Sequence, residues 1–108
     1  MSYPRRDEVW LIALDPSTGS EIRKTRPCLV VSPDEMNEPL RTVLVAPMTT
    51  TLRNYPTRIN LTFRRKAGQV ALDQLRAVDR QRLIKRLGII PADTGRKISS
   101  VLVEMFVR

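Results

Sequence analysis

The sequence contains no histidine, and this absence narrows the possible chemistry more than any other feature. Imidazole is the usual general acid or base near neutral pH and the commonest metal ligand. Its absence excludes the two-histidine route to RNA cleavage, imidazole-activated serine or cysteine nucleophiles, and nearly all zinc sites. Catalysis by this chain must use arginine, lysine, carboxylates, hydroxyls or backbone groups. Because acidic residues do not cluster either, we expect no metal site and no cofactor.

Cysteine is almost absent too, since Cys28 is the only one. A single cysteine excludes an internal disulfide and a cysteine-rich metal site. It lies in the apolar run of residues 28–31, so we expect a buried thiol that packs as a small hydrophobe. One free thiol fits a reducing, cytoplasmic compartment. The apolar run of residues 9–14 is too short to span a bilayer, and no secretory signal precedes it, so no membrane contact is expected.

Negative charge is in short supply. Nineteen lysines and arginines oppose eleven acidic residues, which gives a net charge of +8 and a pI near 10.8. This excess favours a polyanionic partner, with nucleic acid first and an anionic membrane surface second, although a positively charged surface without a ligand would look the same. The 108 residues and a hydrophobic fraction of 42% are typical of one globular domain, here residues 1–108.

The pattern of apolar runs and turn residues predicts a mainly β fold. Strands are expected at residues 9–14, 27–32, 42–46, 58–63, 70–72 and 75–78, with a basic turn at residues 64–68. A helical turn or loop is expected at residues 33–39, where Ser32 could serve as the cap. Asp79 could cap a short helix that runs through Lys85 and ends at Gly88.

A final helix is expected after Pro91 and Ala92. Apolar side chains recur there at the i, i+3, i+4 and i+7 spacing of one helix face, namely Ile98, Val101, Leu102 and Met105. Several short strands followed by an amphipathic helix favour a small, strongly bent antiparallel barrel. The apolar face of the helix would then cover one barrel end or contribute to a dimer.

Three blocks of residues stand out, in order along nearly the whole chain. The first block comprises Asp7, Val9 and Trp10, then Leu14-Asp15-Pro16, Gly19-Ser20-Glu21 and Arg26-Pro27. The second is Ala46-Pro47-Met48-Thr49-Thr50, followed by Tyr55-Pro56, and the third is Val70 to Val78. Any one tripeptide would be weak evidence, but the ordered combination is specific, and it resembles the MazF/PemK toxin family.

The resemblance implies the toxin of a bacterial type II toxin–antitoxin pair. The implied fold is an SH3-like barrel shared with gyrase-directed toxins, working as a homodimer. The implied activity is metal-independent cleavage of single-stranded RNA at short sequences, which leaves 2′,3′-cyclic phosphate and 5′-hydroxyl ends. The implied partners are RNA and a cognate antitoxin, which we expect to be acidic because this chain is strongly basic.

The resemblance also assigns candidate catalytic residues. Arg26 matches the family's catalytic arginine, and its planar, permanently charged guanidinium suits phosphate oxygens. Thr49 matches the catalytic threonine, whose hydroxyl can donate to a phosphate oxygen or orient the 2′-hydroxyl. Glu21 falls on a matched position and could act as a base or orient Arg26. The alternatives are a surface arginine and a threonine bonded to its own backbone.

Further residues are candidates for RNA binding: Arg23, Lys24, Thr50, Arg53, Arg58, Asp73, Gln74 and Arg76. Arg64, Arg65 and Lys66 are plausible phosphate contacts as well. Asp73, Gln74 and Arg76 could instead hold the barrel together, and each basic residue could be a solvated surface charge. Two other functions fit the same residues. One is a non-enzymatic nucleic-acid-binding module, which would not need Arg26 and Thr49 in one cleft. The other is a toxin that shares the fold but binds gyrase.

Overall fold

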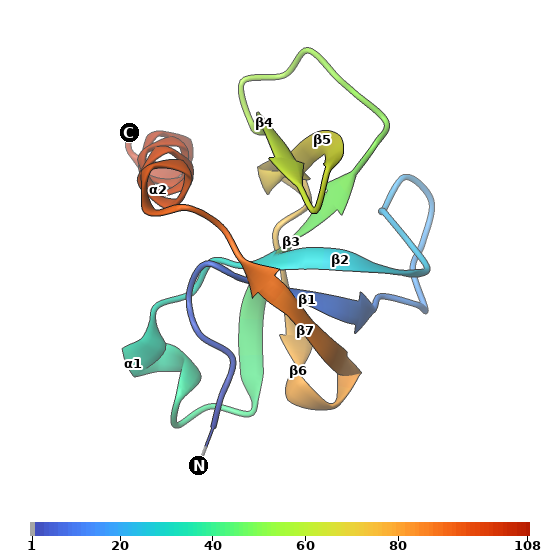
Figure 1. Ribbon diagram of the computed structural model, residues 1–108, viewed down its shortest axis with the longest axis vertical. Helices are drawn as coiled ribbons and strands as arrows, with labels where there is room; N and C mark the ends of the chain where they lie inside the picture. The colour runs from blue at the N-terminus through green and yellow to red at the C-terminus, as the bar shows by residue number, and fades with distance from the viewer. Residues whose placement is uncertain (1) are drawn as a thin grey trace.

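Seven antiparallel strands and a C-terminal helix form the fold of the computed structural model, which describes residues 2–108 (Figure 1). The strands are β1 (Glu8–Ala13), β2 (Thr25–Val30), β3 (Thr42–Thr49), β4 (Arg58–Phe63), β5 (Lys66–Ala71), β6 (Arg76–Asp79) and β7 (Leu83–Ile89). The helices are α1 (Asp34–Asn37) and α2 (Ala92–Phe106), with single 3₁₀ turns η1 (Leu72–Gln74) and η2 (Arg80–Arg82).

The strands form one sheet in the order β4-β5-β3-β2-β1-β7. One edge of β3 pairs with β2, and its other edge pairs first with β6 and then with β5. Register shifts between β1 and β7 add local twist, as β-bulges do. The sheet therefore curls. In the view of Figure 1, the β4–β5 hairpin lies above β2, and β1 and β7 lie below it. The predicted mainly β, antiparallel, strongly bent architecture is confirmed, in the form of a half-barrel.

The hydrophobic core lies in two clusters on either side of the curl. One is built on Val9, Leu29 and Leu72, and the apolar face of α2 packs against it. The other is built on Ile12, Val43 and other fully buried side chains of the β1, β2 and β3 region. The final helix is thus confirmed, and its apolar face packs against the first core cluster (Figure 1). No helix within residues 2–108 combines the length and apolar character needed to cross a membrane.

Cys28 belongs to the second cluster and is fully buried, as expected. Burial raises the pKa of its thiol to about 12. The thiolate, which is the reactive form of cysteine, is therefore disfavoured, and the side chain is a packing residue.

The helix expected from Asp79 to Lys85 is wrong. Asp79 does accept a hydrogen bond from the backbone N–H of Gln81, but it caps only the single turn η2. The chain then enters β7, whose backbone pairs with β1, so Ile84 is 57% exposed and Gly88 lies inside a strand. Pairing with an open strand edge outweighs the weak local preference for helix.

Other boundaries shift by a few residues. β3 continues through Pro47 to Thr49, because the proline nitrogen, which has no hydrogen to donate, is tolerated in this curled sheet. β5 begins at Lys66, inside the expected basic turn. Ser32 does not cap α1, where Pro33 is the N-cap residue; its hydroxyl instead accepts the backbone N–H of Leu44.

Candidate active site

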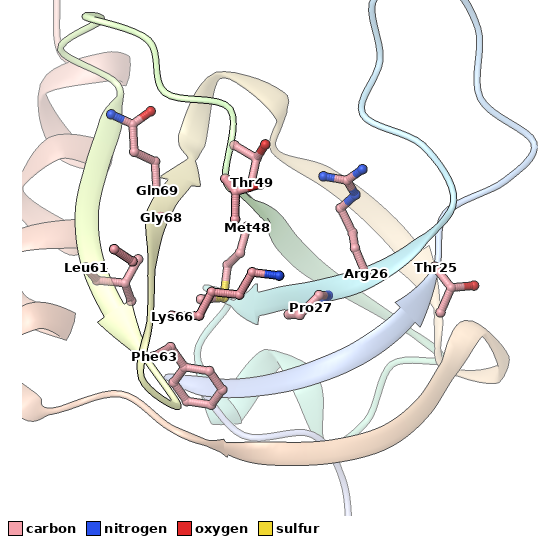
Figure 2. Close-up of a pocket in the computed structure, with 12 residues that line it drawn as sticks. Thr25, Arg26, Pro27, Met48, Thr49, Leu61, Phe63, Lys66, Gly68 and Gln69 are labelled. Atoms are coloured by element: carbon pink, nitrogen blue, oxygen red, sulfur yellow. The ribbon is translucent and has the colours of Figure 1, made fainter.

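The pairing of β2 with β3 brings Arg26 and Thr49 together. The ladder between these strands ends where Cys28 pairs with Pro47, and Arg26 and Thr49 each lie two residues beyond that pair. Both residues line one cleft of about 330 Å³ (Figure 2). Arg26 and Thr49 therefore share one cleft, which the catalytic hypothesis for this pair requires.

A single hydrogen bond, made by Nε, holds the Arg26 side chain in the described structure. Its Nε–H donates to the carbonyl oxygen of Arg23 at 3.0 Å. Within the described part of the chain, its two terminal amino groups make no hydrogen bond or ion pair. Because Pro27 follows, the backbone of Arg26 is biased to be extended, and Arg26 indeed lies in β2. The guanidinium is therefore oriented by its stem, with its fork of donors available to a ligand.

Thr49 ends β3 and is largely buried. Its Oγ1 accepts the backbone N–H of Thr51 at 3.1 Å. A hydroxyl that accepts one hydrogen bond still has its own proton to donate. Arg26 and Thr49 thus present charged and neutral donors to one space, which is the arrangement that stabilises developing negative charge on a phosphate.

Glu21 lies on the loop between β1 and β2. One of its carboxylate oxygens accepts the backbone N–H of Thr18 at 2.6 Å, which closes a turn of that loop. No ion pair joins Glu21 to Arg26 within residues 2–108. Both residues nevertheless line a second cleft of about 530 Å³.

This second cleft gathers most of the remaining candidates. Its lining includes Arg23, Arg53, Arg58, Asp73 and Gln74 together with Arg26 and Thr49. Thr50 lines the first cleft, and Arg76 lines an adjoining pocket while donating to the carbonyl oxygen of Leu14. Lys24 lines none of these spaces; its backbone N–H donates to the carboxylate of Asp15.

Asp73 and Arg58 bind each other rather than standing free. Nε and one terminal nitrogen of Arg58 donate to the two carboxylate oxygens of Asp73, at 2.7 and 3.0 Å, and Thr57 donates to the same carboxylate. The hydrogen bond from Arg58 is the main reason that the pKa of Asp73 lies below its usual value. Tyr55 packs its ring against the guanidinium. This pair joins β4 to η1 and forms a rigid wall of the second cleft.

Gln74 fixes the loop that carries Glu21. Its side-chain oxygen accepts the N–H of Ile22 at 3.1 Å, and its nitrogen donates to the carbonyl of Ser20 at 3.3 Å. The sequence left two roles open for Gln74, base recognition and support of the fold. Its contacts give it a structural role.

The sequence did not reveal every residue that shapes the first cleft. Met48, Leu61 and Phe63 line it as well, beside Lys66, which the sequence had indicated as a phosphate contact (Figure 2). Gln69 also lines it, and its buried amide binds both the N–H and the carbonyl of Arg53. The one sequence feature that indicated this structural role is the position of Gln69 beside the apolar residues at the end of β5. No group of three His, Cys, Asp or Glu residues among residues 2–108 could hold a metal ion.

The fold and cleft can be set beside known proteins. Residues 5–106 match the family described as PemK-like, MazF-like toxins of type II toxin–antitoxin systems. The chain belongs to this family.

Relatives in sequence and in structure agree with this assignment. The endoribonuclease PemK of Escherichia coli is 35% identical over 92 residues, which cover 80% of this chain and 69% of that protein. The crystal structure of MazF from Deinococcus radiodurans superposes with a TM-score of 0.85 at 26% identity and 97% coverage of both chains. A mycobacterial endoribonuclease solved with its cognate antitoxin has a TM-score of 0.79 at 25% identity, covering 94% of this chain and 92% of that one. The MazF/PemK resemblance and the mainly β fold are both confirmed.

Proposed function

We propose that this MazF/PemK family toxin is a sequence-specific, metal-independent endoribonuclease for single-stranded RNA in the bacterial cytoplasm. The observation that carries the proposal is the meeting of Arg26 and Thr49 in one open cleft. The endoribonuclease activity named for PemK of Escherichia coli supports the same substrate.

The reaction follows from the groups present. The ribose 2′-oxygen attacks the adjacent phosphorus, its proton passes to a base, and the bond from phosphorus to the 5′-oxygen breaks. The departing 5′-oxygen takes up a proton, so the products are a 2′,3′-cyclic phosphate and a 5′-hydroxyl end. Arg26 stabilises the charge on the five-coordinate phosphate and can protonate the leaving oxygen, while Thr49 donates to a non-bridging oxygen.

Glu21 is the proposed proton acceptor for the 2′-hydroxyl. It lines the second cleft together with Arg26, and the carboxylate oxygen that does not bind Thr18 is available to accept a proton. Arg23, Lys24, Thr50, Arg53 and Arg76 are proposed to contact the RNA strand on either side of the cut, within a surface that favours polyanions.

The experiment is to incubate the purified protein with RNA in excess EDTA and to analyse the new ends. Cleavage that leaves 5′-hydroxyl ends supports the proposal. RNA binding without cleavage would instead indicate a non-enzymatic nucleic-acid-binding module. Intact RNA together with inhibition of gyrase would indicate the gyrase-directed alternative.

The proposal includes two protein partners. One is a second copy of the chain, because resemblance to a dimeric family coincides with exposed apolar residues along α2, Val103 and Phe106 among them. The other is an antitoxin with an acidic tail. The mycobacterial relative was solved with its antitoxin, and the net charge of +8 per chain attracts acidic peptides as readily as RNA.

A further inference from the structure

The two-residue turn at the tip of the β4–β5 hairpin has a backbone conformation that arginine rarely adopts. Phe63 pairs with Lys66, so the turn consists of Arg64 and Arg65 alone. Their φ angles are +51° and +66°, in the left-handed region where two-residue hairpin turns usually carry Asn-Gly. Both arginine side chains are exposed. An unfavourable backbone that retains two cations at the surface indicates a role for those cations.

The same hairpin forms the apolar end of the first cleft. From Arg26 and Thr49 the cleft runs to the side chains of Met48, Leu61 and Phe63, and the Lys66 side chain extends toward Pro27 between them (Figure 2). All three apolar side chains are half-buried, so each keeps a surface toward the cleft. At about 330 Å³ the space lies at the small end of the range for ligand pockets.

The ring of Phe63 packs against a glycine. A Cβ at Gly88 of β7 would lie 3.0 Å from Cζ of Phe63, so the ring packs closely on the strand backbone there. This contact fixes an aromatic ring at the cleft wall. A fixed aromatic face is what proteins use to stack the bases of single-stranded nucleic acid.

We propose that this apolar end, formed by Met48, Leu61 and Phe63, is a subsite for one nucleobase next to the cleaved bond. Arg64 and Arg65, with Lys66 beside them, hold the phosphates beyond that base. The inference rests on the proposed function and extends it from cutting to sequence selection. RNA is the occupant that fits, because one cleft joins the phosphate-binding donors to an apolar wall and to Lys66, and the turn formed by Arg64 and Arg65 directly precedes Lys66.

The first test changes the ring and nothing else. Phe63→Leu keeps an apolar side chain against Gly88 but removes the flat face. We expect the affinity for uncleavable single-stranded RNA, with a 2′-deoxy nucleotide at the cut position, to fall by about 5- to 150-fold, the range for one lost base stack. Cleavage of a randomised RNA pool should lose its preference at one position beside the cut. The matched control is Tyr3→Leu, which removes an aromatic ring that lines none of these clefts and lies outside α2, and it should bind and cut as wild type does.

The second test replaces the turn by its favoured sequence. Arg64→Asn with Arg65→Gly relieves the turn, so thermal unfolding should show no loss of stability. The slope of log affinity against log salt should become shallower by about 1.4, or about 0.7 for each of two phosphates on single strands. Arg41→Gln with Lys97→Gln removes the same charge outside the cleft and should leave the slope near the wild-type value.

The outcomes separate this inference from the proposed function. Wild-type protein that cleaves no RNA would overturn both. Wild-type protein that cleaves, with Phe63→Leu keeping the same base preference and affinity, would overturn only the base subsite. An unchanged salt slope in the turn variant would overturn the phosphate contacts. A loss confined to the affinity for an acidic antitoxin peptide would assign the hairpin to that partner and overturn the inference.

Discussion

Gly68 tests whether the fold itself positions Thr49. Gly68 lies in β5 beside the end of β3, and a Cβ built there would be 2.7 Å from the carbonyl oxygen of Thr49. That atom is backbone, so it cannot rotate away as the end of a side chain would. Gly68→Ala must therefore push β5 away from the end of β3, where Thr49 lies.

Two opposing free-energy contributions determine how Gly68→Ala changes the stability of the protein. Alanine in place of glycine in a strand gains about 0.5–1 kcal/mol from reduced chain entropy. Overpacking a closely packed site costs about 1–3 kcal/mol, so a net loss of about 1–2 kcal/mol of unfolding free energy is expected. A shift of up to about 1 Å at a reacting group can cost about 10²-fold in rate, so kcat should fall by one to two orders of magnitude.

Denaturant unfolding and steady-state cleavage of a short RNA measure the two effects. We expect a folded protein with a lowered kcat and a nearly unchanged KM, because the basic surface that binds RNA is untouched. Ala77→Ser, at an exposed position of β6 that lines none of these clefts, is the control and should match wild type. A Gly68→Ala protein that cleaves at the wild-type rate would refute the claim that this strand contact positions Thr49 for catalysis.

Further predictions concern the site, the ion pair and the assembly. Arg26→Ala and Thr49→Ala should unfold as wild type does in thermal scans, yet each should lower cleavage by about 10²–10³-fold, as loss of one stabilising donor does. Asp73 has a lowered pKa in the folded protein. Its ion pair with Arg58 therefore stabilises the fold at pH values above the pKa of the carboxyl group in the unfolded chain. This stabilisation is lost as the pH falls through the pKa of Asp73 in the folded protein. Asp73→Asn should thus cost about 1–2 kcal/mol at pH 7, and urea titrations should show that the difference from wild type shrinks in acid. Light scattering should report about twice the chain mass of 12.4 kDa, and a monomer would contradict the homodimer. Uncleavable RNA should displace a labelled acidic antitoxin tail, whereas simultaneous saturation by both would indicate inhibition away from the cleft.

The sequence predicted those elements whose signal lies within the element itself. The alternation in Arg58–Phe63 and the apolar stripe of α2 each indicated the correct structure, because period and burial coincide there. The segment 79–88 did not, since its strand forms only when β7 pairs with β1, which is distant in the chain. Local preference carries no information about such a partner.

The same division applies to the site. Family-matched blocks identified Arg26 and Thr49, and the β2–β3 register explains why they meet. The sequence could not show that Arg58 and Asp73 satisfy each other, or that Gln74 anchors a loop more than 50 residues away. Those contacts depend on how the loops fold back over the sheet. The apolar end of the first cleft was missed because its residues come from β3 and from the β4–β5 hairpin.

The central claim is that the ribose 2′-hydroxyl is the nucleophile, assisted by Arg26 and Thr49. The most direct test is a single 2′-deoxy substitution at the nucleotide whose 2′-oxygen would attack, in an RNA that wild-type protein cuts at one known position in EDTA. The account predicts that binding persists while cleavage at that bond is abolished, and that the all-ribose control yields 5′-hydroxyl ends. Cleavage of the substituted RNA at an undiminished rate, or a product with a 5′-phosphate, would contradict it.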